Sequence, residues 1–160
     1  MMTVHFETMK DLRHKAELVA MMQSLYSEDE AESPVDRSLF PRTVEQLVGQ
    51  PARGRIMLFT AGDTLCGYAL LIPYWSNEFG GTLLYVDEIF VVEEARNQGI
   101  AKLFFGFLDK ERPFDAVALA LEVSAGNTRA RKLYESLGFT RRRNSTLTFR
   151  LSEYDGRGAM

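Results

Sequence analysis

The stretch IFVVEEARNQGIAKLFFGFL, residues 89–108, joins an apolar strand, a charged turn and an amphipathic helix without a spacer. After Gly99 the apolar side chains recur at the spacing of one helical face, at Ile100, Leu103, Phe104, Phe107 and Leu108. The first turn of a helix has free N–H groups and a partial positive charge, which attract anions. From physics alone, a seat for a phosphate group and a plain helix start explain this junction equally well.

Small and basic residues surround the junction. Gly99 has no side chain to keep a phosphate off the free N–H groups, and Ala101 is nearly as small. Arg96 and Lys102 add positive charge beside it. The junction has neither the Gly-Lys-Ser/Thr ending of a P-loop nor the Gly-x-Gly-x-x-Gly of a dinucleotide fold, so its pattern suits a pyrophosphate held in another way.

Periodicity on both sides of the junction predicts a single α/β domain over residues 1–154 and a loose tail at 155–160. We expect helices over residues 11–26, 42–51, 99–110 and 127–139. We expect strands over residues 3–7, two hairpin arms within 54–75, and strands over 83–92, 116–124 and 145–151, with a short extra strand near 140–142. This order predicts a mixed central sheet of six to seven strands, flanked by about four helices, with one parallel crossover.

Composition narrows the classes of function. A net charge of −3 disfavours nucleic-acid binding, and the run 141–143 of arginines suits a solvated turn. The single cysteine, Cys66, permits no internal disulfide and suits a buried small side chain. His5 and His14 lie far from any metal-ligand spacing, so no metal site is expected. No apolar segment approaches the roughly 18 residues that span a membrane, and a cytoplasmic location is expected.

Two motifs resemble the GNAT superfamily of N-acetyltransferases. The series Arg96-x-x-Gly99-x-Ala101, directly after a strand ending in IFVV, is similar to the acyl-coenzyme-A motif of that family, which more often has glycine in place of Ala101. The segment LEVSAGNTRARKLYESLGF, residues 121–139, is similar to the family's strand, asparagine, tyrosine-bearing helix and Gly-Phe. The resemblance covers roughly residues 55–140 and implies the GNAT fold and an acetyl-CoA-dependent N-acetyltransferase.

The resemblance also implies where acetyl-CoA binds. The backbone of Ile89, Phe90 and Val91 would pair with the amides of the pantetheine arm as a borrowed strand does, while the side chains serve the core. The pyrophosphate would lie against the loop and first helical turn formed by Arg96, Asn97, Gln98, Gly99, Ile100, Ala101 and Lys102. Asn127 suits a helix N-cap, and the family pattern adds contacts to the cofactor at Asn127, Arg129 and Ala130.

Tyr134 lies on the apolar stripe of the last helix, where an aromatic residue usually serves the core. The family pattern implies instead that Tyr134 is the general acid. Coenzyme A leaves as a thiolate, whose thiol pKa is about 8.5, and a phenol with a pKa of about 10 can donate a proton to that sulfur.

Asp87 and Glu88 are adjacent charges in an otherwise apolar strand, a costly arrangement unless they face a wet cleft or a partner. Alternation predicts that they point to opposite faces of the sheet. The segment TLLYVDEIFV, residues 82–91, is most similar to the diamine (spermidine/spermine-type) acetyltransferases, which implies that Asp87 takes the proton of the amine and Glu88 holds a cationic substrate. The alternative is a structural pair, one carboxylate bound to an arginine and the other capping a strand end.

Three further residues are candidates for contact with the substrate. Tyr74 and Trp75, expected on a loop, can wall an amine pocket by cation–π contact, or belong to a plain turn. Glu28, in the acidic stretch 27–34, can steer a cation inward, or be simply solvated.

The expected function is direct transfer of an acetyl group to a small cationic or polyamine-like primary amine, without an acyl-enzyme and without a metal. Acetylation of a protein or peptide amine, and a non-catalytic CoA-sensing domain, are the alternatives. The expected partner is a small-molecule amine, not nucleic acid or membrane, and a homodimer is possible.

Overall fold

The computed structural model describes residues 2–29 and 34–151, and in this part of the chain a five-stranded sheet is flanked by four α-helices. The strands are β1 (His5–Thr8), β2 (Arg55–Ala61), β3 (Thr64–Ser76), β4 (Gly81–Val91) and β5 (Ala118–Leu121). The helices are α1 (Lys15–Glu28), α2 (Phe40–Gly49), α3 (Ile100–Glu111) and α4 (Thr128–Ser136), with short 3-10 helices at Arg37–Leu39, Glu93–Ala95 and Pro113–Asp115.

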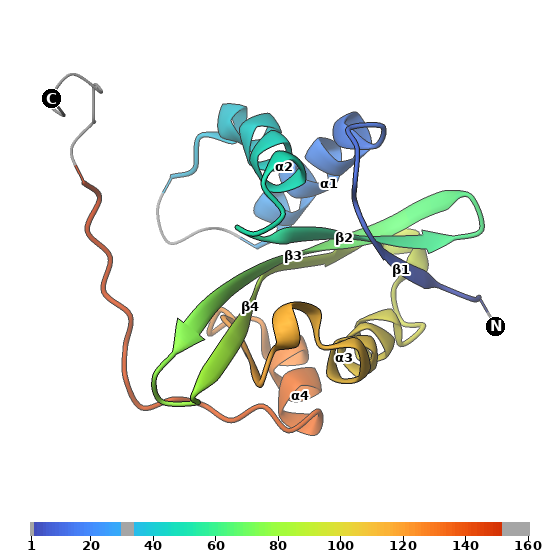
Figure 1. Cartoon of the computed structure of the whole chain (residues 1–160). Coiled ribbons are helices and arrows are strands. Elements are labelled where there is room, and N and C mark those ends of the chain that lie inside the picture. The colour runs from blue at the N-terminus through green and yellow to red at the C-terminus, as the bar shows by residue number, and fades with distance from the viewer. Residues whose placement is uncertain (1, 30–33, 152–160) are drawn as a thin grey trace, which may run out of the picture.

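The sheet is mixed, as predicted, and its strands lie in chain order from β1 to β5. The first four strands pair antiparallel, while β4 and β5 pair in parallel across the crossover that contains α3. Figure 1 shows α1 and α2 on one face of the sheet and α3 and α4 on the other. Because β4 lies between β3 and β5 and is covered on both faces, its sequence is almost wholly apolar.

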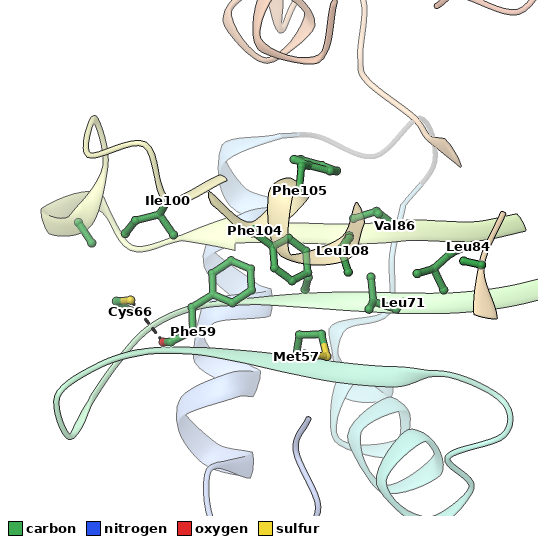
Figure 2. Packing of buried hydrophobic residues seen from close by; sticks show 13 residues of the cluster. Met57, Phe59, Cys66, Leu71, Leu84, Val86, Ile100, Phe104, Phe105 and Leu108 are labelled. Atoms are coloured by element: carbon green, nitrogen blue, oxygen red, sulfur yellow. Dashed lines mark hydrogen bonds between the residues drawn. The ribbon is translucent and has the colours of Figure 1, made fainter. Parts of the chain in front are cut away.

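The core beneath α3 is aromatic (Figure 2). Phe104 is fully buried, and its ring lies 4.6 Å from the ring of Phe59 on β2. Truncating a buried phenylalanine of this kind to alanine costs about 3–5 kcal/mol, so this contact anchors α3 on the sheet. Cys66 lies in the same cluster, where its thiol donates to the Phe59 carbonyl at 3.3 Å and burial raises its pKa, in agreement with a buried small side chain.

The prediction of six to seven strands is wrong for the described chain. Neither residues 140–142 nor residues 145–151 form a strand, and the second segment extends away from the sheet (Figure 1). Its sequence alternates as a strand does, but a strand also requires a pairing partner, and within its own described chain this segment has none. The tail predicted at 155–160 lies outside the described residues.

Helix ends follow local chemistry. The first helix begins at Lys15 and not at residue 11, because Asp11 binds the backbone N–H of Arg13 in a turn. The last helix ends at Ser136, followed by Gly138 at φ +98° and a bond from the Phe139 N–H to the Tyr134 carbonyl. Among the described residues, no helix is long and apolar enough to cross a membrane.

Candidate active site

The N-terminus of α3 has no side-chain cap. Gly99 is the N-cap residue, at φ +73° and ψ 18°, and its carbonyl accepts the first bond of the helix from Leu103. The N–H groups of Ile100, Ala101 and Lys102 therefore precede the helical ladder, and Gly99 has no side chain to cap them. A Cβ added at Gly99 would meet nothing within 4 Å, so the glycine leaves free space over these donors. This geometry fits the predicted pyrophosphate seat.

Two arginines, Arg96 and Arg129, contact residues near the N-terminus of α3. The Arg96 guanidinium donates from Nε to the Val91 carbonyl at 2.8 Å and from Nη2 to both oxygens of Glu28, at 3.0 and 2.8 Å. Arg129 of α4 contacts the side chain of Asn97, whose backbone is left-handed at φ +64°. Glu28, predicted as a substrate contact, is thus paired with Arg96.

Strand β4 separates from β5 next to this seat. Their pairing ends at Val86 and Leu121, while β4 continues to Val91 on the β3 side. The Val92 N–H donates to the Cys66 carbonyl of β3 at 2.9 Å, so the backbone groups of Val92, and of Phe90 two residues before it, face β3. Since backbone groups alternate along a strand, those of Ile89 and Val91 face the opened side. This is where an extended ligand could pair, with the Val91 carbonyl already bound by Arg96.

A β-bulge lies at the acidic pair. Leu71 pairs with Val86 and Leu70 with Glu88, so Asp87 is an extra residue on β4. Val86 and Ile89 both pack in the cluster beneath α3, so both residues between them point to the other face, toward α1. The prediction that Asp87 and Glu88 point to opposite faces is therefore wrong, because a bulge interrupts the alternation on which it rested.

Two tyrosines hold Glu88. The hydroxyl of Tyr26, on α1, donates to its Oε2, and that of Tyr68, on β3, donates to its Oε1, each at 2.8 Å. Burial raises the pKa of Glu88, and the two hydrogen bonds offset part of that rise. Burial, followed by the nearby Glu88 charge, raises the pKa of both tyrosines, so they stay protonated donors.

Asp87 is exposed beside a third carboxylate. Partial desolvation, and then the charge of Glu122 just after β5, raise the pKa of Asp87. Burial, followed by Glu122, also raises the pKa of Tyr85. None of the ion pairs in the described chain involves Asp87 or Glu88, so the structural alternative of an arginine partner finds no support there.

We call Tyr26, Tyr68, Tyr85, Asp87, Glu88 and Glu122 the acidic–tyrosine cluster. Burial, together with the neighbouring carboxylates Glu122 and Asp87, raises the pKa of Asp87 and of Glu88, so a cation among the three carboxylates is favoured. The three tyrosines and Glu122 are not among the residues predicted from the sequence. Tyr85 could have been found from the sequence, because it lies two residues before Asp87 on the same strand. Tyr26, Tyr68 and Glu122 could not, because they come from elements distant in sequence.

The remaining candidates lie in regular structure. Tyr134 is half-buried on α4, with its ring 5.7 Å from that of Phe105, and burial followed by the Asp29 charge raises its pKa. Asn127 is the N-cap of α4, as predicted, and its side chain accepts from the Ala130 N–H at 3.1 Å. Because its raised pKa keeps the Tyr134 hydroxyl protonated, Tyr134 suits a proton donor, while its ring also packs against the core.

Tyr74 and Trp75 lie in β3 and not on a loop, which corrects the prediction. They pair with Leu83 and Thr82, and their exposed fractions are 53% and 71%. Ile72 pairs with Tyr85, so Tyr74, two residues on, shares the face of the acidic–tyrosine cluster and Trp75 takes the opposite one. In the described residues no group of His, Cys, Asp and Glu side chains is suited to a metal ion.

Comparisons with known proteins identify the family. The model of the acetyltransferase (GNAT) family matches residues 17–139. No curated protein matches the sequence significantly.

Solved structures share the fold. A "possible acetyltransferase" from Clostridium difficile 630 is 18% identical, with a TM-score of 0.80 over 94% of this chain and 99% of its own. An aminoglycoside N-acetyltransferase in complex with CoA is 17% identical, with a TM-score of 0.73 over 95% of this chain and 97% of its own. A ribosomal-protein-alanine N-acetyltransferase from Brucella melitensis is 21% identical, with a TM-score of 0.69 over 93% of this chain and 100% of its own. With the family model spanning most of its length, the chain belongs to the acetyltransferase (GNAT) family and is an N-acetyltransferase.

Proposed function

We propose that the protein transfers the acetyl group of acetyl-CoA directly to a small cationic primary amine of the diamine or polyamine type. The observation that carries the proposal is the bulge at Asp87, which turns two adjacent carboxylates toward one face, beside Glu122. A site with three carboxylates and four tyrosines, Tyr74 included, suits an alkyl diammonium through charge and cation–π contact.

The binding of acetyl-CoA is supported by two features that meet at the end of β4. The open N–H groups of Ile100, Ala101 and Lys102 would take the pyrophosphate, and Arg96 would add positive charge. The free backbone edge at Ile89 would take the pantetheine arm. The structurally similar aminoglycoside acetyltransferase was solved with CoA, which is consistent with this assignment.

The chemistry of transfer needs one base and one acid. An alkyl ammonium has a pKa of about 10.4, so it must lose a proton before its nitrogen can attack. Asp87, exposed and with a raised pKa, accepts that proton, while Glu88 is held by its tyrosines and binds positive charge. As the N–C bond forms and the C–S bond breaks, Tyr134 donates its proton to the departing sulfur, and the second proton that the nitrogen loses on becoming an amide restores the Tyr134 phenol. No residue needs to form an acyl-enzyme, and buried Cys66 has a raised pKa unsuited to that role.

A protein amine is the second candidate acceptor, favoured by the similarity to the ribosomal-protein-alanine acetyltransferase. The two candidates differ in what surrounds the amine. A peptide N-terminus carries one ammonium followed by a neutral chain, so it would bring one positive charge to the three carboxylates, whereas a diammonium would bring two. A CoA sensor without catalysis would need neither Tyr134 nor the acidic pair.

The test is a thiol-release assay with acetyl-CoA across polyamines, matched monoamines, aminoglycosides, lysine analogues and alanine-terminated peptides. We expect the highest kcat/KM with a diamine. Preference for a peptide would support the second candidate. CoA binding without turnover of any amine would indicate a sensor. The homodimer and the cytoplasmic location stay predictions.

A further inference from the structure

Two neighbouring carboxylates, Glu28 and Asp29, lie at the C-terminal end of α1. The carbonyl groups at this end of a helix carry partial negative charge, so carboxylates there are unfavourable unless a partner offsets them. The described residues of this last turn include no basic side chain. The backbone N–H of Asp29 donates to the Leu25 carbonyl at 2.9 Å, which fixes the helix end. The partners of both carboxylates therefore come from other elements of the fold.

These partners lie on the two sides of the opening between β4 and β5. Glu28 accepts from Nη2 of Arg96, which follows β4 in the chain. Asp29 accepts from Oγ of Ser124, which follows β5, at 3.1 Å. Both partners come after the last paired residues of the two strands. The end of α1 therefore connects the two strands across their opening, and we call Glu28 and Asp29 the α1 strap.

The contact of Asp29 with Ser124 also connects α1 to the start of α4. The Ser124 carbonyl accepts from the N–H of Asn127, the N-cap residue of α4, at 3.1 Å. Burial, followed by the Asp29 charge, raises the pKa of Tyr134 on α4, so this carboxylate also lies near that helix. Asp29 and Ser124 are both exposed, so the hydrogen bond between them can be removed without opening the core.

We propose that Asp29 and Ser124 are positioning residues for acetyl-CoA. Their hydrogen bond, together with the Glu28–Arg96 pair, holds the end of β4 and the segment after β5 in place on both sides of the pantetheine arm. A site that is held in its binding shape before the ligand arrives loses less freedom on binding, which raises affinity. The proposal rests on the acetyl-CoA site of the proposed function, and adds to it the residues that keep that site formed.

Calorimetry with CoA as the probe tests the α1 strap. Ser124→Ala removes the hydroxyl that Asp29 accepts from, and we expect the Kd of CoA to rise about threefold to tenfold, the range for one hydrogen bond. Asp29→Ala removes a negative charge as well, so the informative comparison is Ser124→Ala with and without Asp29. In the Asp29→Ala background, Ser124→Ala should have no further effect, because the bond is already lost.

Two control variants separate the strap from the general stability of α1. Ser124→Thr keeps the hydroxyl and should bind CoA as wild type does. Glu45→Gln removes the ion pair between Lys15, at the other end of α1, and α2, and should leave the Kd of CoA unchanged. Circular dichroism checks that each variant is folded.

Hydrogen exchange supplies a second measurement. In wild type, CoA should slow the exchange of amides in the last turn of α1, including the Asp29 N–H that is bound to Leu25. This response to CoA should be lost in Ser124→Ala. A purely structural contact would change protection of the free protein and leave its response to CoA intact.

Four results would overturn the proposal. They are unchanged or tighter CoA binding by Ser124→Ala, the same loss of affinity when Asp29 is already alanine, an equal loss in Ser124→Thr or Glu45→Gln, and a response of α1 to CoA that survives in Ser124→Ala. A wild-type protein that does not bind CoA would overturn the proposed function together with the strap, so the two failures are distinguishable.

Discussion

Val86 and Glu88 are two residues apart on β4 yet lie on opposite faces of the sheet, because Asp87 bulges between them. Val86 packs in the core beneath α3, while Glu88 accepts hydrogen bonds from Tyr26 of α1 and Tyr68 of β3. Without the bulge, Glu88 would follow Val86 into the apolar cluster, where an unpaired carboxylate would be strongly destabilising. The bulge thus creates the acidic face of the site and ends the pairing with β5 at the same point.

Asp87→Asn and Glu88→Gln should change different kinetic parameters, kcat for the first and KM for the second. Asp87→Asn removes the proton acceptor, so kcat should fall most at neutral pH and recover in part as the amine itself deprotonates at higher pH. Glu88→Gln should raise KM for a diamine more than for the matched monoamine. The measurement is a pH–rate profile of wild type and both variants with each amine. Identical behaviour of the two variants, or changes below about twofold, would make the pair structural.

Tyr134→Phe keeps the ring against Phe105 and Phe139 and removes only the hydroxyl. We expect kcat to fall about 10²-fold or more, with acetyl-CoA affinity nearly unchanged, because only proton donation to the leaving sulfur is lost. Steady-state kinetics and calorimetry measure the two effects separately. A kcat near that of wild type would leave Tyr134 as a core aromatic residue.

Gly99→Val should abolish acetyl-CoA binding, because a branched side chain would cover the N–H groups at the start of α3. Its φ of +73° also strains any side chain there, by about 1–2 kcal/mol. Gly106→Ala is the matched control, an exposed glycine within the same helix whose added Cβ meets nothing within 4 Å. It should raise the free energy of unfolding by about 1 kcal/mol and leave affinity unchanged. Unchanged calorimetric affinity in a folded Gly99→Val protein would disprove the phosphate seat.

Glu28→Gln tests which side of the site Glu28 serves. Since both of its oxygens accept from Arg96, we expect KM for the amine to stay within about twofold and acetyl-CoA affinity to fall as Arg96 loses its positioning partner. The loss of stability should be under about 1 kcal/mol, because the pair is partly exposed. A rise in amine KM of about fivefold or more would instead assign Glu28 to substrate binding.

Asp87→Asn should also stabilise the protein at neutral pH. The folded pKa of Asp87 is raised above its ordinary 3.8, so ionising it destabilises the fold as pH rises through that folded pKa. The difference in free energy of unfolding between variant and wild type should be positive at pH 7 and vanish below about pH 3.8. We expect it to stay under about 1 kcal/mol, because the side chain is exposed. Urea unfolding at several pH values measures it, and a variant less stable than wild type at pH 7 would contradict the assigned shift.

Much of the fold follows from local sequence. The helical spacing after Gly99, the Asn127 cap and the apolar run of β4 each predict an element that the structure contains, because these signals act over a few residues. The same motifs indicated the acetyltransferase family, which the family model confirms. The predicted start of the first helix at residue 11 was wrong, since Asp11 and Arg13 form a turn where periodicity alone predicts a helix.

Tertiary structure decided on which face of the sheet Asp87 and Glu88 lie and whether residues 145–151 form a strand. Asp87 is recognisable as a bulge only from its register against Leu70 and Leu71, since strand pairing, and not strand composition, sets the register. Tyr26 reaches Glu88 across 62 residues, a contact that no local pattern encodes. Residues 145–151 read as a strand, but a strand forms only where an edge receives its backbone hydrogen bonds. The sequence by itself therefore determined which elements can form, and only their packing decided which of them pair and what they surround.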